Sequence, residues 1–183
     1  EGLDRLHSSG LMGHANSFAR RLIRWDDERE LLDVVEKGDL LLMASEAAEH
    51  AGQPHEAEQY ARTATDLARD EKLAALGARA AGRLGVLKLQ HDTPEEAEHW
   101  LWDALRFART SGDQRALADV NLSLGYFYQR REKLDLSSTA YQVCLELAVE
   151  NEMGVAELSA RAALAGLDRV MGHLERAEKT FEA

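Results

Sequence analysis

Among the side chains of this 183-residue chain that could ligate a metal ion are seven histidines and the single Cys144. His55-Glu56 begins like the zinc-protease motif, but that motif needs a second histidine four residues after the first, and position 59 is Gln. We interpret the histidines, which show no i,i+4 pair, as solvated residues near helix ends. The sequence therefore predicts no metal and no cofactor. A metal-dependent enzyme stays open as a hypothesis that metal analysis of the purified protein would test.

Signatures of nucleophilic catalysis and nucleotide binding are also missing, because the sequence has no phosphate-binding glycine loop, no GxSxG and no CxxC. Cys144 falls at a position that suits a small residue, where a thiol behaves as a small apolar side chain. We predict no catalytic residues and a protein that is not an enzyme.

The charge of the chain excludes further classes. With 22 Lys+Arg against 33 Asp+Glu, the net charge is -11, and non-specific nucleic-acid binding needs the opposite surplus. The longest obvious apolar run, 40–44, is far shorter than the ~20 residues of a membrane span. One cysteine cannot form an internal disulfide. We expect no nucleic-acid partner, no membrane partner and a cytoplasmic location. Because the chain starts without Met and stops in mid-pattern, we also expect a fragment of a larger protein.

The elements that position these residues are predicted to be helices. Ala and Leu dominate, whereas β-branched residues are few, aromatic residues make up 6% and Pro occurs twice. The fold class is therefore all-α. Apolar spacing of three or four residues places helices at about 39–51, 54–69, 73–91, 94–110, 114–131, 135–150, 153–171 and 174–182.

At two places the sequence contains residues that are typical of helix ends. Thr93, Pro94 and Glu96 predict an N-terminal capping box with Pro at the first helical position. Gly112 suits the left-handed position that ends one helix, and Asp113 suits the cap of the next. The pair Gly38-Asp39 is interpreted as a helix start or a kink.

The chain also repeats with a period of forty residues. Pro54 and Pro94 lie forty apart in similar contexts, and two columns of small residues recur in the same register. These columns are Ser45, Gly85, Gly125 and Ala165, and, twelve residues later, Ala57, Ala97, Ser137 and Ala177. Small residues in step predict close crossings between antiparallel helices, which must stack into a curved superhelix.

This pattern resembles the tetratricopeptide repeat, whose consensus has Leu-Gly, an aromatic residue, a small residue and a second aromatic residue at fixed offsets. Leu124-Gly125, Tyr128, Ser137 and Tyr141 match it closely, Leu84-Gly85, Ala97 and Leu101 match in part, and Ala177 with Phe181 match the last copy. The forty-residue period resembles the longer variant found in kinesin light chains, Pins-type adaptors and bacterial signalling regulators. The resemblance implies a right-handed superhelical solenoid of antiparallel helix pairs.

The resemblance covers residues 39–183, which we divide into repeats at about 39–72, 73–112, 113–152 and 153–183. Residues 1–38 match poorly, since Arg5 falls at a position of close crossing. We interpret this segment as a degenerate repeat or the tail of a preceding domain.

The resemblance further implies a concave ligand surface on the first helix of each repeat. In this register the concave residues are Asp39, Leu42, Met43, Glu46, Arg79, Gly82, Arg83, Val86, Asp119, Leu122, Ser123, Tyr126, Ser159, Ala162, Ala163 and Gly166. The Lys and Asn clamp that grips a C-terminal carboxylate in this family does not occur at these columns. The candidate partner-binding residues are Arg79, Arg83, Leu122, Tyr126, Gln129 and Arg130.

Two arginines one turn apart, Arg79 and Arg83, would favour a protein or peptide partner with an acidic segment. The alternative is that both arginines pair with Asp or Glu on adjoining helices. A further candidate is Trp102, which lies about 200° around the helix from Trp100, so that both cannot face one neighbour. Trp102 either packs against the next repeat or anchors a partner or a second copy of the chain.

These features predict a non-catalytic scaffold or sensor module of a signalling or regulatory protein that binds a peptide or helix in its concave groove. The alternative is an assembly module that self-associates through its convex face and its ends. Light scattering at several concentrations separates the two.

Overall fold

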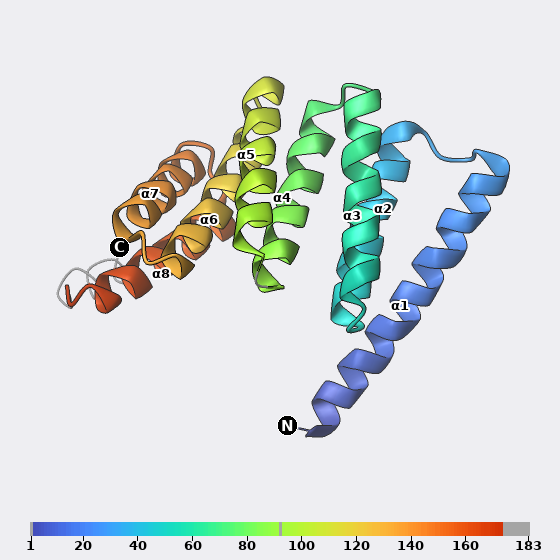
Figure 1. Ribbon diagram of the computed structural model, residues 1–183, viewed down its shortest axis with the longest axis horizontal. Coiled ribbons are helices and arrows are strands. Elements are labelled where there is room, and N and C mark those ends of the chain that lie inside the picture. The colour runs from blue at the N-terminus through green and yellow to red at the C-terminus, as the bar shows by residue number, and fades with distance from the viewer. Residues whose placement is uncertain (1, 92, 174–183) are drawn as a thin grey trace.

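The computed structural model describes residues 2–91 and 93–173, which form eight helices arranged one after another (Figure 1). The helices are α1 (Gly2–Arg29), α2 (Val34–His50), α3 (Pro54–Asp70), α4 (Ala74–Gln90), α5 (Pro94–Ser111), α6 (Gln114–Arg130), α7 (Leu134–Glu150) and α8 (Gly154–Val170). The prediction of an all-α fold is confirmed. From α2 to α8 a helix begins every twenty residues, so each forty-residue period holds two helices. The helix predicted at 174–182 lies outside the described residues.

The predicted start of the first repeat helix at residue 39 is wrong. The helix α2 begins at Val34, because the Asp33 carboxylate accepts a hydrogen bond from the amide of Glu36 at 2.8 Å and the Glu36 carboxylate accepts one from the amide of Asp33 at 3.0 Å. Gly38 lies inside the helix and is buried, and a Cβ there would overlap the side chain of Leu76 in α4. This glycine allows two neighbouring repeats to approach each other, and it neither starts nor kinks the helix.

The capping box predicted at Thr93 is also wrong, although Pro94 does open α5. The hydroxyl of Thr93 donates to the carbonyl of Lys88 at 2.9 Å, and Glu96 binds the ammonium of Lys88 at 2.7 Å. Both polar groups of the expected box therefore stabilise the end of α4. The prediction for the following turn is confirmed. Gly112 has a φ of 69°, and Asp113 caps α6 through the amides of residues 115 and 116.

The columns of small residues mark the crossings within each repeat. A Cβ on Gly85 would lie 2.6 Å from Cγ of Leu101, and one on Gly125 would overlap the ring of Tyr141. Serine hydroxyls also hold crossings: Ser45 donates to the carbonyl of Ala57 between α2 and α3, and Ser137 donates to the carbonyl of Gly125 at the same crossing as Tyr141, each at 2.8 Å. The small residues thus let a second helix contact the backbone of the first.

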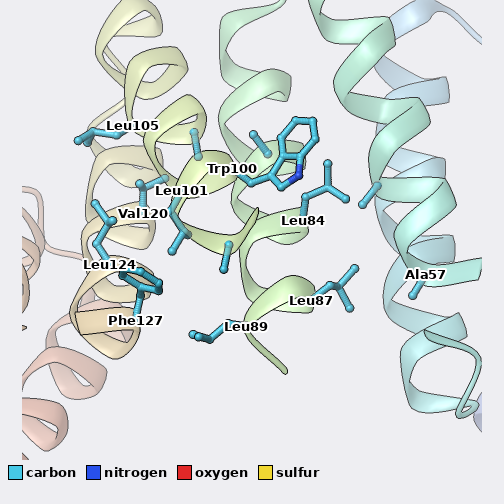
Figure 2. Close-up of a cluster of buried hydrophobic side chains, with 14 of the residues drawn as sticks. Ala57, Leu84, Leu87, Leu89, Trp100, Leu101, Leu105, Val120, Leu124 and Phe127 are labelled. Carbon is cyan, nitrogen blue, oxygen red and sulfur yellow. The ribbon is translucent and has the colours of Figure 1, made fainter. Parts of the chain in front are cut away.

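The curvature of the solenoid follows from which helices touch. The first helices of successive repeats pack closely, as α2 packs on α4 and α4 packs on α6, whereas the backbones of α3 and α5 stay further apart and are joined by side chains such as Arg69 and Asp103. The helices α2, α4, α6 and α8 therefore line the inner side, and α3, α5 and α7 lie outside. Figure 2 shows the main core, where Leu84 of α4 meets Trp100 and Leu101 of α5.

The helix α1 forms the N-terminal edge of the row (Figure 1). In its described part, Ala19 is the one apolar side chain that is buried. Polar contacts provide much of the remaining attachment. The amide of Asn16 donates to Gln53 at 2.7 Å and to Glu56 at 3.0 Å, and Arg20 forms an ion pair with Glu56. Across the described residues, no helix combines the length and the apolar character of a membrane span.

Candidate functional site

A hollow of ≈ 260 Å³ lies on the inner side between α4 and α6. The residues that line it are Ala78, Arg79, Gly82, Arg83, Val86, Ala116, Asp119, Val120 and Ser123. Six of these, at positions 79, 82, 83, 86, 119 and 123, are on the predicted concave surface. Gly82 helps to form the space, because a Cβ there would meet other atoms only at 3.8 Å and beyond. The hollow thus has a small, apolar floor and a charged rim.

Both arginines of the rim are paired across to the preceding repeat. Arg79 donates to the carboxylate of Asp39 at 2.6 Å. Arg83 donates to the hydroxyl and the carbonyl of Ser45, both at 3.2 Å, and forms an ion pair with Glu49. The arginines therefore make ion pairs with adjoining helices, which was the alternative to a free positive strip. The partner Glu49 was missed, because it does not share a repeat column with Arg83, whereas Asp39 and Arg79 occupy the same column.

Asp119 continues the column of Asp39 and Arg79, so charge alternates in sign along the inner side. Asp119 is exposed on this side, and its partial desolvation by the surrounding chain raises the pKa of its carboxyl. Its negative charge, together with the larger effect of burial, raises the pKa of the nearby Cys144 thiol to about 11. Cys144 has no exposed surface and is therefore a protonated packing residue at neutral pH.

The remaining predicted groove residues do not line this hollow. Leu122 packs beside Cys144 in a small cluster between α6, α7 and α8. The Gln129 side-chain carbonyl accepts a hydrogen bond from the Tyr141 hydroxyl at 2.9 Å. Tyr126 and Arg130 are further along α6, where both side chains are exposed. The structure therefore brings Arg79 and Arg83 together in the hollow and spreads the other four residues along the helix toward its C-terminal end.

The two tryptophans of α5 face opposite ways, as their spacing predicts. Trp100 is buried, and the guanidinium groups of Arg62 and Arg69 lie 5.5 and 5.4 Å from its ring centre. Trp102 is 49% exposed on the outer side. Of the two alternatives for Trp102, packing against the next repeat does not bury it.

Histidines and carboxylates do not converge on a cation site within the described residues. No group of three or more His, Cys, Asp or Glu side chains has the arrangement of metal ligands there. His50, His55, His91 and His99 are all exposed, and His99 makes an edge contact with Trp100 at 5.4 Å between ring centres.

Comparison with known proteins identifies the fold. No protein-family model and no curated protein matches the sequence. Among solved structures, BtubC (BKLC) from P. vanneervenii has a TM-score of 0.78 and 16% identity over 94% of this chain and 71% of that chain. The putative kinesin light chain TPR-like repeats of Podosopora anserina have a TM-score of 0.72 and 11% identity, covering 94% of this chain and 84% of that one.

A third structure is a Rap conjugation gene regulator of the plasmid pLS20, solved in complex with the Phr* peptide. Its TM-score is 0.73 at 14% identity, and the match covers 97% of this chain and 50% of that chain. The protein is therefore an all-helical repeat solenoid with the tetratricopeptide-like fold, and the predicted resemblance is confirmed at the level of the fold.

Proposed function

We propose that this chain is a non-catalytic protein-interaction module that holds a peptide or a helical segment of a partner in its concave groove. The observation that carries the proposal is the hollow between α4 and α6, with Gly82 and Val120 at its floor and Arg79 and Asp119 at its rim. Small apolar hollows with a few polar groups at the edge are typical of sites that accept one side chain of a peptide and orient its backbone. The Rap regulator solved with a peptide supports this use of the fold.

The ligand would extend from the hollow along α6. One apolar side chain of the peptide fills the space beside Gly82, and the chain then passes Leu122, Tyr126, Gln129 and Arg130. Tyr126 is 46% exposed and offers aromatic surface, while Arg130 makes no ion pair with any described residue. Such a path uses all six groove residues named from the sequence.

An acidic segment would bind through Arg79 more readily than through Arg83. The Arg79 and Asp39 side chains are 50% and 46% exposed, so their ion pair is screened by water and exchanges at little cost. The guanidinium of Arg83 donates to three acceptors, so it stays bound to Ser45 and Glu49 and fixes the position of α4 against α2. Asp119 at the rim repels carboxylates, so we propose a single acidic group beside an apolar residue.

We further propose that the module works in the cytoplasm as part of a larger signalling or regulatory protein. The match to the Rap regulator supports the larger size, because the matched region spans half of the length of that regulator. The full-length gene would test the proposal directly, since an attached kinase, ATPase or DNA-binding domain would identify the pathway.

The test of groove binding begins with peptides selected on the intact chain from a random display library. Gly82→Leu places a side chain into the hollow, and its Cβ meets neighbours only at ordinary contact distance, so the fold is retained. We expect the selected peptides to bind the unmodified chain and to lose at least ~tenfold in affinity for Gly82→Leu. Gly13→Leu is the matched control, because Gly13 is also helical and a Cβ added there would meet no atom within 4 Å. Selected peptides that bind both variants equally would exclude the hollow as the site.

Self-association is the second candidate function, and the outward stripe of α1 favours it. Phe18 and Trp25 are 61% and 51% exposed, and they lie with Leu22 on one face of the helix. Exposed aromatic residues in a row are common at protein interfaces. Sedimentation velocity at several concentrations, with Phe18→Ser/Trp25→Ser as the comparison, tests this candidate. A monomer at every concentration would exclude it.

A further inference from the structure

The outer face of the solenoid carries cations that differ from those of the inner hollow. Two hollows of ≈ 320 and ≈ 300 Å³ lie along the C-terminal halves of α3 and α5 and share Arg106 and Thr110. The other lining residues are Ala68, Arg69, Lys72, Ala74 and Phe107 in the first and Trp102, Leu105 and Arg109 in the second. Four of these residues are cations and none is a carboxylate, in a chain whose net charge is -11.

The four cations have too few counter-charges. Arg69 and Arg106 both bind the carboxylate of Asp103, at 2.7 and 3.0 Å. Lys72 and Arg109 are exposed and make no ion pair within the described part of the chain. On the inner side, by contrast, each of the two arginines of the hollow has a carboxylate of its own. Two cations without an ion-pair partner among the described residues, Lys72 and Arg109, therefore lie on the outer face.

Other acidic residues near this surface do not change that balance. Asp66 is a second, longer-range partner of Arg69 at 3.5 Å, and its side chain is 60% exposed. Asp70 and Glu71 follow Arg69 along the chain, but neither lines one of the hollows or pairs with their cations. The hollows themselves are lined by four cations and no carboxylate, and two of these cations, Lys72 and Arg109, make no ion pair with a described residue.

Aromatic surface accompanies these charges. Trp102 is half-exposed at one end, and Phe107 is half-buried between the two hollows. Gly77 of α4 makes room for Phe107, since a Cβ there would lie 2.7 Å from the Phe107 ring. The guanidinium of Arg106 lies 5.3 Å from the centre of the same ring. The rigid packing of α4 against α5 thus presents an aromatic residue and a cation side by side.

We propose that this surface, the outer basic groove formed by Arg69, Lys72, Trp102, Arg106 and Arg109, binds an acidic segment of a protein partner. Carboxylates of the segment pair with Lys72 and Arg109, and an aromatic or aliphatic side chain covers Trp102 and Phe107. The backbones of α3 and α5 stay apart and are bridged by Arg69 and Asp103, so an extended segment can lie along the two hollows beside that bridge. Four cations in an acidic molecule suit a short peptide better than a nucleic acid, whose regular phosphates need a larger basic face.

The test uses a fluorescein-labelled synthetic peptide of nine residues, with Phe and Leu at the centre and Glu elsewhere, and the same peptide with Gln in place of every Glu. Fluorescence anisotropy with the whole chain should show binding of the Glu peptide only, weakening as salt is raised. Lys72→Glu/Arg109→Glu should weaken it at least ~tenfold, and Trp102→Ala by a similar factor. Arg131→Glu/Arg169→Glu is the matched control, because it makes the same change in charge at exposed positions outside both hollows.

Four outcomes would overturn the proposal. They are equal binding of the Gln peptide, equal loss in the control variant, unchanged binding by Lys72→Glu/Arg109→Glu, and tighter binding of a labelled single-stranded oligonucleotide than of the Glu peptide. If the charge-reversed variant fails to fold by circular dichroism, Lys72→Gln/Arg109→Gln replaces it, with a smaller loss expected. Gly82→Leu should leave this binding unchanged, so failure here is distinguishable from failure of the concave site.

Discussion

Asp39 and Arg79, forty residues apart in one column of the repeat, form an ion pair of 2.6 Å that joins α2 to α4. Both side chains are half-exposed, so we expect Arg79→Glu to change the free energy of unfolding by less than about 1 kcal/mol. Arg83→Glu should cost more, about 1–3 kcal/mol, because it removes bonds to Ser45 and places a carboxylate beside Glu49. Urea denaturation of the two variants checks the order. Arg83→Glu as stable as Arg79→Glu would show that the contacts of Arg83 carry no stability. Changing both Arg79 and Arg83 to Glu is therefore a poor test of ligand binding, because the Arg83 substitution also lowers the stability of the fold.

The Gly125 crossing gives a second prediction. A side chain at Gly125 would overlap the buried ring of Tyr141, so Gly125→Leu should destabilise the fold by about 1–3 kcal/mol or more. Gly112→Ala meets no neighbour and suffers only the left-handed backbone at φ 69°, which costs about 1 kcal/mol. Thermal melts of both variants measure the difference. A Gly125→Leu variant that melts like the unmodified chain would rule out the close crossing.

Burial of Cys144 predicts a loss of stability in alkali. Its pKa is raised from 9.0 to about 11 in the folded chain, so the folded state holds a proton that the unfolded state releases. The stabilising effect is complete below pH 9 and declines as the pH rises toward 11. Urea midpoints measured from pH 7 to 10 should fall less steeply for Cys144→Ala than for the unmodified chain. Parallel curves would contradict the assignment to this thiol.

The link between α1 and α2 gives a prediction in acid. The Asp26 carboxylate accepts hydrogen bonds from the amides of Leu32 and Leu31 at 2.9 and 3.0 Å and pairs with Lys37 at 3.2 Å, and these contacts lower its pKa below 3.8. A lowered pKa means that the stabilisation is present above pH 3.8 and is lost only as the pH falls through the lower, folded-state value.

Hydrogen exchange at the amides of Leu31 and Leu32 measures that link. Exchange should be slow at pH 5 and become faster, relative to the rest of the chain, in Asp26→Ala at the same pH. Asp27→Ala is the control, because Asp27 is exposed and contacts only Lys37. Equal protection in the two variants would mean that Asp26 does not hold the turn.

The sequence predicted the structure best at positions where packing admits only one kind of residue. Gly125 and Ser137 lie in columns that only small residues can fill, so the period predicted the crossings and the helix pairs. Gly38 was misinterpreted because a glycine that breaks a helix and a glycine that makes room inside one look alike without the neighbour, Leu76. Glu36, three residues after Asp33, was the signal in the sequence for the true start of α2. Thr93 was misassigned because its hydroxyl had a closer acceptor on the preceding helix.

The candidate site was only partly predictable for a related reason. The repeat register placed Arg79 and Arg83 on the inner side, since side-chain direction follows from helical phase. It did not give the partner of Arg83, because the reach of a long side chain across to Glu49 depends on the distance between helices. Nor did it show the outer basic groove, because its hollows depend on the distance between the backbones of α3 and α5, which side chains such as Arg69 and Asp103 bridge.

The attachment of α1 has a consequence for how the solenoid comes apart. The buried Asn16 donates to Gln53 and Glu56, Ile23 packs against the apolar cluster that contains Leu41, and the exposed Arg20 forms an ion pair with Glu56. Salt screens the exposed ion pair while leaving the apolar core between α4 and α6 intact. We therefore expect α1 to detach before the following repeats unfold, and to do so more readily as ionic strength rises.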